Sequence, residues 1–167
     1  SVAVFEAESE PGGALRHGIP EYHLPREVLA REIERIRSQG VEIHCDVRVG
    51  GNLSWQELES HDAIFLASGA RVNRPLELAG QDPADVRPGL EFLREAKAGD
   101  RGAVGHRVVV VGGTDTAVDC ARTALRLGAD AVVICQGTRA DLSASTEAFD
   151  EAIREGVCFE FQVWPVA

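Results

Sequence analysis

The chain has 167 residues, and 27 acidic against 17 basic residues give a formal net charge of −10 at pH 7. Hydrophobic residues make up 44% and charged residues 26% of the sequence, a composition that excludes an intrinsically disordered chain. The acidic balance argues against nucleic-acid binding, because phosphate contacts need a basic surface. No apolar stretch reaches the roughly 20 residues that a transmembrane helix needs, so we expect no membrane span.

The predicted elements of the first part of the chain follow the periodicity of its apolar residues. The predicted strands cover residues 1–7, 41–49 and 62–67, and the predicted helices cover residues 26–39 and 55–58. In the longer helix, Leu29, Ile33 and Ile36 have helical spacing, and Asn52 or Ser54 is expected to cap the shorter one. Residues 9–13 are predicted to form a loop. Residues 16–25, rich in Gly and Pro, are predicted to form a loop or short turns rather than a helix.

The second part of the chain alternates strands and helices. Residues 71–104, with several Pro and Gly, are predicted to be a connector containing one helix at 90–98. After it, the predicted strands cover residues 107–111, 131–135 and 157–163, and the predicted helices cover residues 115–127 and 146–155. This alternation predicts an α/β fold of Rossmann-like βαβ units with parallel sheets.

The cysteines and histidines offer no metal site. Cys45, Cys120, Cys135 and Cys158 form no C-x-x-C pair, the spacing that redox dithiols and zinc or iron–sulfur sites use. We predict separate thiols, mostly buried, in a reducing, cytoplasmic compartment. His17 and His23 are the only histidines with close spacing, and we expect no metal there.

A glycine turn follows the strand predicted at 107–111. The dinucleotide-binding pattern G-x-G-x-x-G/A falls on Gly112, Thr114 and Ala117. A strand that enters a glycine turn and then a helix provides free N–H groups for a pyrophosphate. Thr114 occupies a position where Gly usually allows close approach, and Asp115 would repel a phosphate. A strand–turn–helix without any ligand therefore remains an open alternative.

Residues that bind a dinucleotide ribose are expected at the ends of strands. The segment Cys135-Gln136-Gly137-Thr138-Arg139 has no acidic residue for an NAD ribose. Arg139 is either a phosphate contact or a solvated loop residue, so neither NAD nor NADP is favoured. Glu6, at the end of the first predicted strand, is either an acid that binds the ribose of an adenine dinucleotide or a plain surface residue. The glycine turn that would precede such an acid by about 20 residues is not in the sequence.

These segments resemble the glutamate synthase small-subunit family of FAD-dependent NAD(P)H oxidoreductases, which includes the flavin part of dihydropyrimidine dehydrogenase. The resemblance is carried by Phe5-Glu6-Ala7-Glu8, by Pro11-Gly12-Gly13-Ala14-Leu15-Arg16-His17-Gly18-Ile19-Pro20-Glu21-Tyr22-His23-Leu24-Pro25, by Phe65-Leu66-Ala67-Ser68-Gly69-Ala70, and by Val110-Val111-Gly112-Gly113 with Thr116-Ala117-Val118-Asp119. It runs in order through essentially the whole chain. The Gly-Ile-Pro-Glu-Tyr-x-Leu-Pro segment is its most specific part.

The resemblance implies two nested dinucleotide-binding lobes: a partial FAD lobe over residues 1–70, the connector over 71–104 and an NAD(P)-binding-like lobe over 105–167. It implies hydride transfer between NAD(P)H and FAD, with onward transfer to an electron-acceptor subunit or iron–sulfur protein. No acid–base residue is assigned. The residues implied for FAD are Glu6, Gly12, Gly13, Leu15, Arg16, Val49, Ser68 and Gly69. Those considered for NADP or NAD are Gly112, Gly113, Thr114, Asp115, Thr116 and Arg139.

The chain departs from the family pattern at several positions. Thr114 and Asp115 replace a Gly and an Asn, and Gln136 and Gly137 replace an Arg pair. The first glycine loop and the closing FAD segment of the family are missing, and the sequence has no Met. We therefore expect a central fragment that is inactive when isolated and binds both cofactors weakly. The competing hypothesis is a degenerate nucleotide-binding module with a structural or assembly role.

Overall fold

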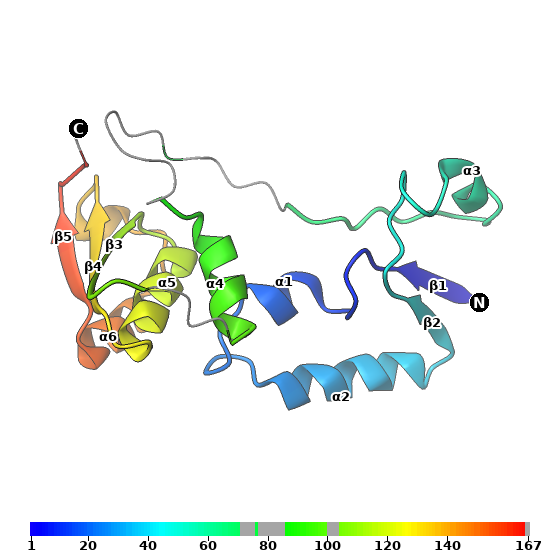
Figure 1. Ribbon diagram of the computed structural model, residues 1–167, viewed down its shortest axis with the longest axis horizontal. Coiled ribbons are helices and arrows are strands. Elements are labelled where there is room, and N and C mark those ends of the chain that lie inside the picture. The colour runs from blue at the N-terminus through cyan, green and yellow to red at the C-terminus, as the bar shows by residue number, and fades with distance from the viewer. Residues whose placement is uncertain (71–75, 77–85, 100–103, 166–167) are drawn as a thin grey trace. The chain divides into compact units, whose positions relative to one another are not determined.

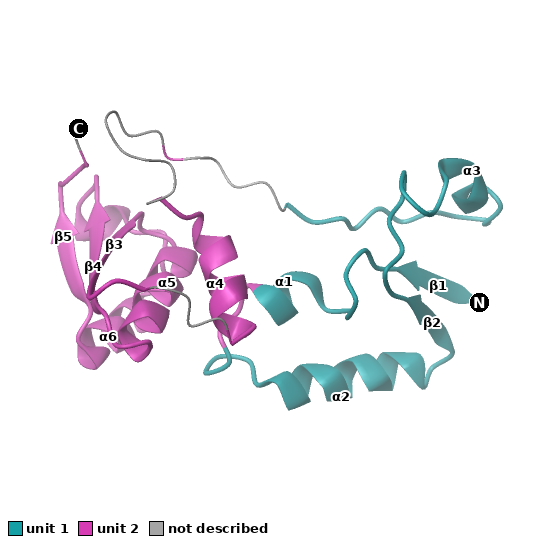
Figure 2. Cartoon of the chain, viewed as in Figure 1, with its two compact units in different colours: residues 1–17, 21–72 teal, residues 18–20, 73–167 magenta. Residues whose placement is uncertain are grey.

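The computed structural model describes residues 1–70, 76, 86–99 and 104–165. The chain divides into two compact units (Figure 2). Unit 1 contains residues 1–17 and 21–72, and unit 2 contains residues 18–20 and 73–167.

Unit 1 is built around a pair of parallel strands. Its elements, labelled in Figure 1, are β1 (Val2–Phe5), α1 (Gly13–His17), α2 (Arg26–Arg37), β2 (Val41–His44) and α3 (Trp55–Leu58). Val2 lies opposite Val41, and Phe5 lies opposite His44. The helix predicted at 26–39 is α2, and its Leu29 is buried. Ser54, rather than Asn52, caps α3 through a reciprocal capping box with Glu57.

Two predictions for unit 1 are wrong in part, and a third, the strand at 62–67, is wrong. The second strand stops at His44 because Asp46 adopts φ +58°, which interrupts the extended backbone. Residues 13–17 form the one-turn helix α1, which extends into the segment predicted as loop at 16–25. Residues 62–67 form no strand, and Phe65 is 92% exposed there. An apolar stretch becomes a strand only when a neighbour satisfies its backbone, and no described strand pairs with this one.

Unit 2 contains the parallel sheet that the sequence predicted. Its elements are α4 (Gly89–Lys97), β3 (Arg107–Val111), α5 (Asp115–Arg126), β4 (Asp130–Cys135), the 3₁₀ helix η2 (Arg139–Asp141), α6 (Thr146–Glu155) and β5 (Cys158–Phe161). The strands lie in the order β3-β4-β5, all parallel, with Arg107 opposite Asp130 and Val132 opposite Cys158. The α/β class and the βαβ units are thus confirmed.

Small side chains form the core of unit 2. Val118, Ala121 and Ala124 of α5, Val133 of β4 and Ala152 of α6 are fully buried. Alanines on the inner face allow α5 to pack closely against the sheet and against α6. The aromatic rings of Phe149, Phe159 and Phe161 pack together beside this core.

The helix predicted at 90–98 is α4, and it packs on α5 within unit 2. The Cys120 thiol of α5 donates a 3.4 Å hydrogen bond to the Gly89 carbonyl, and burial raises the pKa of Cys120 to about 12. Lys97 Nζ donates to the Ile19 carbonyl at 2.6 Å, which holds residues 18–20 in this unit. Much of the predicted connector, 71–75, 77–85 and 100–103, lies outside the described residues.

None of the described helices is both long and apolar enough to cross a membrane. Cys45, Cys120, Cys135 and Cys158 are all free thiols; Cys120 and Cys135 are buried as expected, whereas Cys158 is exposed.

Candidate functional site

The glycine turn between β3 and α5 has a geometry that depends on its glycines. Gly112 has φ +139°, a conformation that side chains other than Gly rarely adopt. A Cβ on Gly113 would lie only 2.8 Å from Leu142 Cδ2. The backbone at Gly112 would therefore be strained for any residue with a side chain. At Gly113 there is no room for a side chain, because Leu142 of the loop after β4 lies close to it.

That loop, residues 136–145, is hydrogen-bonded onto the turn. The amides of Ser143 and Ala144 donate to the Gly113 carbonyl at 3.0 and 2.9 Å. The Ser145 amide donates to Asp115 Oδ1 at 3.0 Å. Asp115, considered above only as a charge that repels phosphate, thus fixes the end of this loop at the start of α6.

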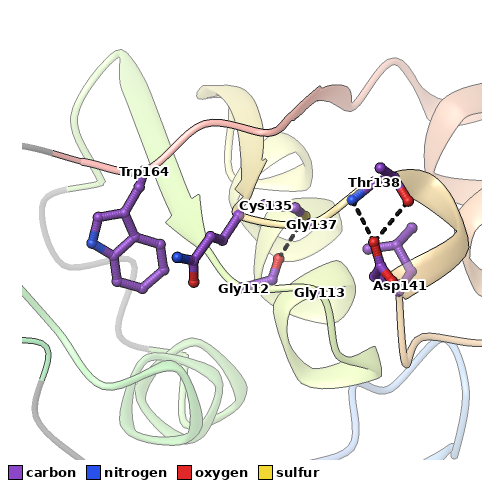
Figure 3. A pocket seen from close by; sticks show the side chains of 9 residues that line it. Gly112, Gly113, Cys135, Gly137, Thr138, Asp141 and Trp164 are labelled. Atoms are coloured by element: carbon purple, nitrogen blue, oxygen red, sulfur yellow. Dashed lines mark hydrogen bonds between the residues drawn. The ribbon is translucent and has the colours of Figure 1, made fainter.

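A small hollow of about 180 Å³ lies beside the turn. Its lining residues are Gly112, Gly113, Cys135, Gln136, Gly137, Thr138, Asp141, Leu142 and Trp164. Figure 3 shows Trp164 on one side of the glycine turn and Thr138 with Asp141 on the other. Ligand pockets are usually about 300–1,000 Å³, so this hollow suits part of a dinucleotide rather than the whole molecule.

The turn lies near the positive end of the α5 dipole and near two negatively charged carboxylates. The first N–H groups of α5 have no acceptor within the helix and lie at the positive end of its dipole. The Thr114 hydroxyl accepts a 3.3 Å hydrogen bond from the Ala117 amide and is the N-cap of α5. The carboxylates of Asp115 and Asp141 lower the affinity of this region for anions.

Asp141 is held by a capping box in the loop after β4. Its Oδ2 accepts hydrogen bonds from the Thr138 hydroxyl at 2.7 Å and the Thr138 amide at 2.8 Å. The hydroxyl hydrogen bond, followed by the amide one, lowers the pKa of Asp141 below its usual range. The carboxylate is therefore charged at neutral pH.

Cys135 is a structural donor in the same region. Its thiol donates a 3.1 Å hydrogen bond to the Gly112 carbonyl, drawn as a dashed line in Figure 3. Burial raises the pKa of the Cys135 thiol. A protonated thiol ties the end of β4 to the turn and is a poor nucleophile.

Four of the residues considered for FAD lie together in unit 1. Gly12 precedes α1, which begins at Gly13 and carries Leu15 and Arg16. The Leu15 and Arg16 amides donate to the Gly12 carbonyl. Arg16 Nε donates to the Pro11 carbonyl at 2.7 Å, and its Nη1 lies 3.2 Å from Glu10 Oε2. The guanidinium is thus fixed by the preceding loop.

The other residues considered for FAD are spread over unit 1. Glu6 follows β1, and its Oε1 accepts a hydrogen bond from the Glu8 amide. Val49 forms an isolated bridge with Leu53. Ser68 and Gly69 lie in an exposed stretch without helix or strand. Within the described part of the chain, the hydrogen bonds do not join Ser68 or Gly69 to Gly12 or Glu6.

Arg139 turns toward α6 instead of lining the hollow. Its Nη2 lies 3.4 Å from Asp150 Oδ1, and its guanidinium lies 4.4 Å from the centre of the Phe149 ring. The sequence reasoning missed Asp141 and Trp164 as hollow residues. The spacing Thr138-x-x-Asp141 is a capping-box signal that predicts a carboxylate folded back toward the strand end.

A parallel βαβαβ sheet with a glycine turn at the carboxyl end of its first strand is the architecture of a dinucleotide-binding domain. Residues 12–163 match the pyridine nucleotide-disulphide oxidoreductase family, and the chain belongs to that family. The resemblance to glutamate synthase small subunits is confirmed by the relatives below. Family membership supports flavin and nicotinamide cofactor binding in general.

The relatives are considerably longer proteins. NADPH-Fe(3+) oxidoreductase subunit beta of Geobacter sulfurreducens is 43% identical over 97% of this chain and 25% of its own length. A putative glutamate synthase [NADPH] small chain of Cereibacter sphaeroides is 36% identical over 98% of this chain and 41% of its own length. The chain therefore spans less than half of either relative.

The solved structure of 2-naphthoyl-CoA reductase in complex with 2-naphthoyl-CoA resembles the chain in fold. The TM-score is 0.77 at 17% sequence identity, over 99% of this chain and 25% of that one.

Proposed function

We propose that the chain is a segment of a flavin-dependent NAD(P)H oxidoreductase, with unit 2 binding the nicotinamide dinucleotide and unit 1 forming part of an FAD site. The observation that carries this proposal is the Gly112–Gly113 turn, with its adjoining hollow, at the carboxyl edge of a parallel sheet. When bound, the two cofactors supply hydride-transfer chemistry. The chain's own residues bind and orient them.

The turn fits the pyrophosphate part of a dinucleotide. Gly112 has no side chain to block a ligand from the backbone, whereas Leu142 lies close beside Gly113. The α5 N-terminus offers N–H donors to an anion. The Trp164 indole provides a flat apolar face at the other side of the hollow. We assign Gly112, Gly113, Thr114, Asp115 and Thr116 to this site.

For the flavin, we retain the sequence assignment. Glu6 is proposed to bind a ribose hydroxyl, and Gly12, Gly13, Leu15 and Arg16 to line the nucleotide. Val49, Ser68 and Gly69 complete that proposal. The grouping of four of these residues at the turn into α1 supports it.

We further propose that dinucleotide binding is weakened by Thr114 and Asp115. The Thr114 side chain adds bulk next to the turn, and the Asp115 carboxylate has the same sign of charge as a pyrophosphate. Asn at position 115 would keep an oxygen that accepts from the Ser145 amide and would remove the charge.

The test is calorimetric titration of NADH and NADPH into the chain and into the variant Thr114→Gly/Asp115→Asn. We expect the variant to bind at least about tenfold more tightly, a gain of about 1.4 kcal/mol. Asp130→Asn is the matched control, since it removes one charge at the opposite end of β4. Absence of saturation in both chains up to about 5 mM would contradict the proposed function.

We also propose an electron-accepting partner, which is another subunit or an iron–sulfur protein. The names of the relatives, a subunit beta and a small chain, support the first of these. We also propose a cytoplasmic location, because free cysteines are typical of proteins in a reducing compartment. The competing hypothesis of a purely structural module is not favoured, because the family match and the oxidoreductase relatives cover nearly the whole chain.

A further inference from the structure

We propose that Cys135 is a positioning residue for a dinucleotide pyrophosphate: its thiol holds the Gly112 carbonyl and thereby aims the Gly113 amide at the ligand. This inference rests on the proposed function, because it requires a dinucleotide bound at the glycine turn. It adds the group that orients an N–H donor of the turn before the ligand arrives, and it favours neither NADH nor NADPH.

Both backbone groups of Gly112 are held by the last two residues of β4. The Gly112 amide donates to the Ile134 carbonyl at 3.1 Å. The Gly112 carbonyl accepts from Cys135 Sγ, also at 3.1 Å, as the dashed line in Figure 3 shows. Among the described residues, no backbone amide donates to this carbonyl. The side chain of Cys135 therefore anchors the turn at the point where the pairing between β3 and β4 ends.

The planar peptide between Gly112 and Gly113 turns this anchor into a direction. In a trans peptide, the C=O and N–H bonds point to opposite sides. Because the Gly112 carbonyl points toward Cys135, the Gly113 amide points to the opposite side of the turn. Gly112, at φ +139°, has no side chain that would restrict rotation of this peptide. The thiol therefore fixes an orientation that the glycine backbone alone leaves free.

The Gly113 amide is a donor without an acceptor in the described part of the chain. It immediately precedes Thr114, the N-cap of α5, at the positive end of the helix dipole. An N–H group in this position is suited to donate to an oxygen of a bound anion. The direction that Cys135 imposes on the peptide is therefore the direction in which the turn can receive a pyrophosphate.

The next peptide of the turn does not depend on Cys135. The Gly113 carbonyl accepts hydrogen bonds from the amides of Ser143 and Ala144, at 3.0 and 2.9 Å, and from the Ser143 hydroxyl at 3.2 Å. Three donors fix this peptide, whereas a single thiol fixes the one before it. Loss of the thiol is therefore expected to release the Gly113 amide and to leave the rest of the turn in place.

Cysteine suits this position by its size and by its protonation. Cys135 is 5% exposed, and its Sγ lies 3.7 Å from the point that a Cβ on Gly113 would occupy. The sulfur is thus packed against the turn. Burial raises the pKa of the Cys135 thiol, so the thiol keeps its proton and remains a donor at neutral pH.

The experiment measures the dissociation constant of NADPH by calorimetry in the unaltered chain and in three variants. Cys135→Ala removes the donor, and we expect it to raise the dissociation constant about threefold or more. Cys135→Ser keeps a donor and should restore most of the affinity. Cys120→Ala is the matched control, because Cys120 is also buried and its thiol donates to a backbone carbonyl, that of Gly89 in α4. It should bind NADPH as the unaltered chain does.

Urea denaturation of the same chains separates positioning from stability. Each alanine variant loses one hydrogen bond from a thiol to a carbonyl, so we expect similar decreases in the two denaturation midpoints. Only Cys135→Ala should also bind NADPH more weakly.

Nuclear magnetic resonance of the unaltered, ¹⁵N-labelled chain tests the inference without any substitution. Titration with NADPH should shift the amide resonance of Gly113 more than that of Ser143, because the Ser143 amide already donates to the Gly113 carbonyl. A Gly113 resonance that stays in place at saturation would overturn the inference.

The outcomes distinguish this inference from the proposed function. Saturable binding with equal constants in the unaltered chain and Cys135→Ala, or equal weakening in Cys120→Ala, would overturn the role of Cys135 and leave the proposed function intact. The cysteine substitutions are repeated in Thr114→Gly/Asp115→Asn, so that weak binding in the unaltered chain does not hide the comparison. Absence of saturation in both backgrounds up to about 5 mM NADPH would overturn the two proposals together.

Discussion

At the scale of single residues, Arg122 is the one buried charged side chain among the described residues, and it forms an ion pair in unit 2. This Arg is only 3% exposed, and its guanidinium binds both oxygens of Glu155, at 2.6 and 3.2 Å, and Glu151 at 3.0 Å. The hydrogen bond from Arg122 is the main reason that the pKa of Glu155 is lowered. The pair joins α5 to α6, so it stabilises the same elements that carry the candidate site.

The lowered pKa of Glu155 predicts how stability depends on pH. A carboxyl whose pKa is lower in the folded state stabilises the fold above its unfolded pKa, near 4.3, and loses that contribution as the pH falls toward the folded value. We expect Glu155→Gln to lower the free energy of unfolding by about 1–3 kcal/mol at pH 7, with a smaller difference near pH 3. Urea denaturation at both pH values measures this. Glu160→Gln, on β5, is the control, and a difference independent of pH would contradict the prediction.

Burial also predicts which thiols react. The Cys120 thiol is buried and its pKa is raised to about 12, whereas Cys158 is exposed. Since the thiolate is the reactive species, we expect Cys158 to react rapidly with a disulfide reagent at pH 8 and Cys120 only after unfolding. Mass spectrometry of the labelled chain distinguishes the two sites. Rapid labelling of Cys120 in the native chain would show that α4 does not cover it.

At the scale of elements, the loop between β4 and α6 is fixed to the β3–α5 turn by three backbone amides, from Ser143, Ala144 and Ser145. Two of them donate to the Gly113 carbonyl and one donates to Asp115. This loop carries Thr138 and Asp141, so the shape of the hollow depends on these contacts. Asp115 is a positioning residue for that loop, whatever its effect on a bound anion.

Limited proteolysis tests this role of Asp115. Asp115→Ala removes the acceptor for the Ser145 amide. An exposed hydrogen bond of this kind contributes about 1 kcal/mol to holding the loop against the β3–α5 turn. We expect trypsin to cleave after Arg139 about fivefold faster in Asp115→Ala. Asp115→Asn, which keeps an acceptor, should be cleaved at close to the rate of the unaltered chain. Equal rates in all three chains would show that the loop is held without Asp115.

At the scale of the whole molecule, the two units differ in the size of their cores. Among described residues, the buried apolar side chains of unit 1 are Leu29 and Leu58, whereas those of unit 2 include Val118, Val133 and Phe149 with several alanines. Free energy of unfolding scales with the apolar surface that folding buries. Unit 1 is therefore expected to be the less stable of the two.

The two tryptophans of the chain allow this difference to be measured, because Trp55 lies in unit 1 and Trp164 in unit 2. Trp164→Phe leaves Trp55 as the reporter, and Trp55→Phe leaves Trp164. We expect the Trp55 signal to change at a lower urea concentration than the Trp164 signal. Coincident midpoints would indicate a single cooperative transition and contradict the prediction.

Most helices and strands could be predicted from the sequence, because the patterns that specify them extend over only a few residues. The helices that became α2, α5 and α6 were predicted from the sequence, and Gly156, in a left-handed conformation, ends α6. The strands β3 and β4 contain runs of Val and Ile, which the sequence shows directly. Residues 62–67 form no strand although they are apolar, because a strand also needs a neighbouring strand to pair with, and the local sequence pattern does not provide one.

The sequence by itself determined the parallel βαβ order and the glycine turn at Gly112, since periodicity, caps and turn glycines act over a few residues. Only the tertiary structure decided which polar groups reach that turn. Asp141 comes to the end of β4 through a capping box and a 3₁₀ turn, Asp115 is bound by the Ser145 amide thirty residues away, and Arg139 turns to α6. These placements depend on how distant segments pack, because a charge acts through its distance in space and not through its distance along the chain.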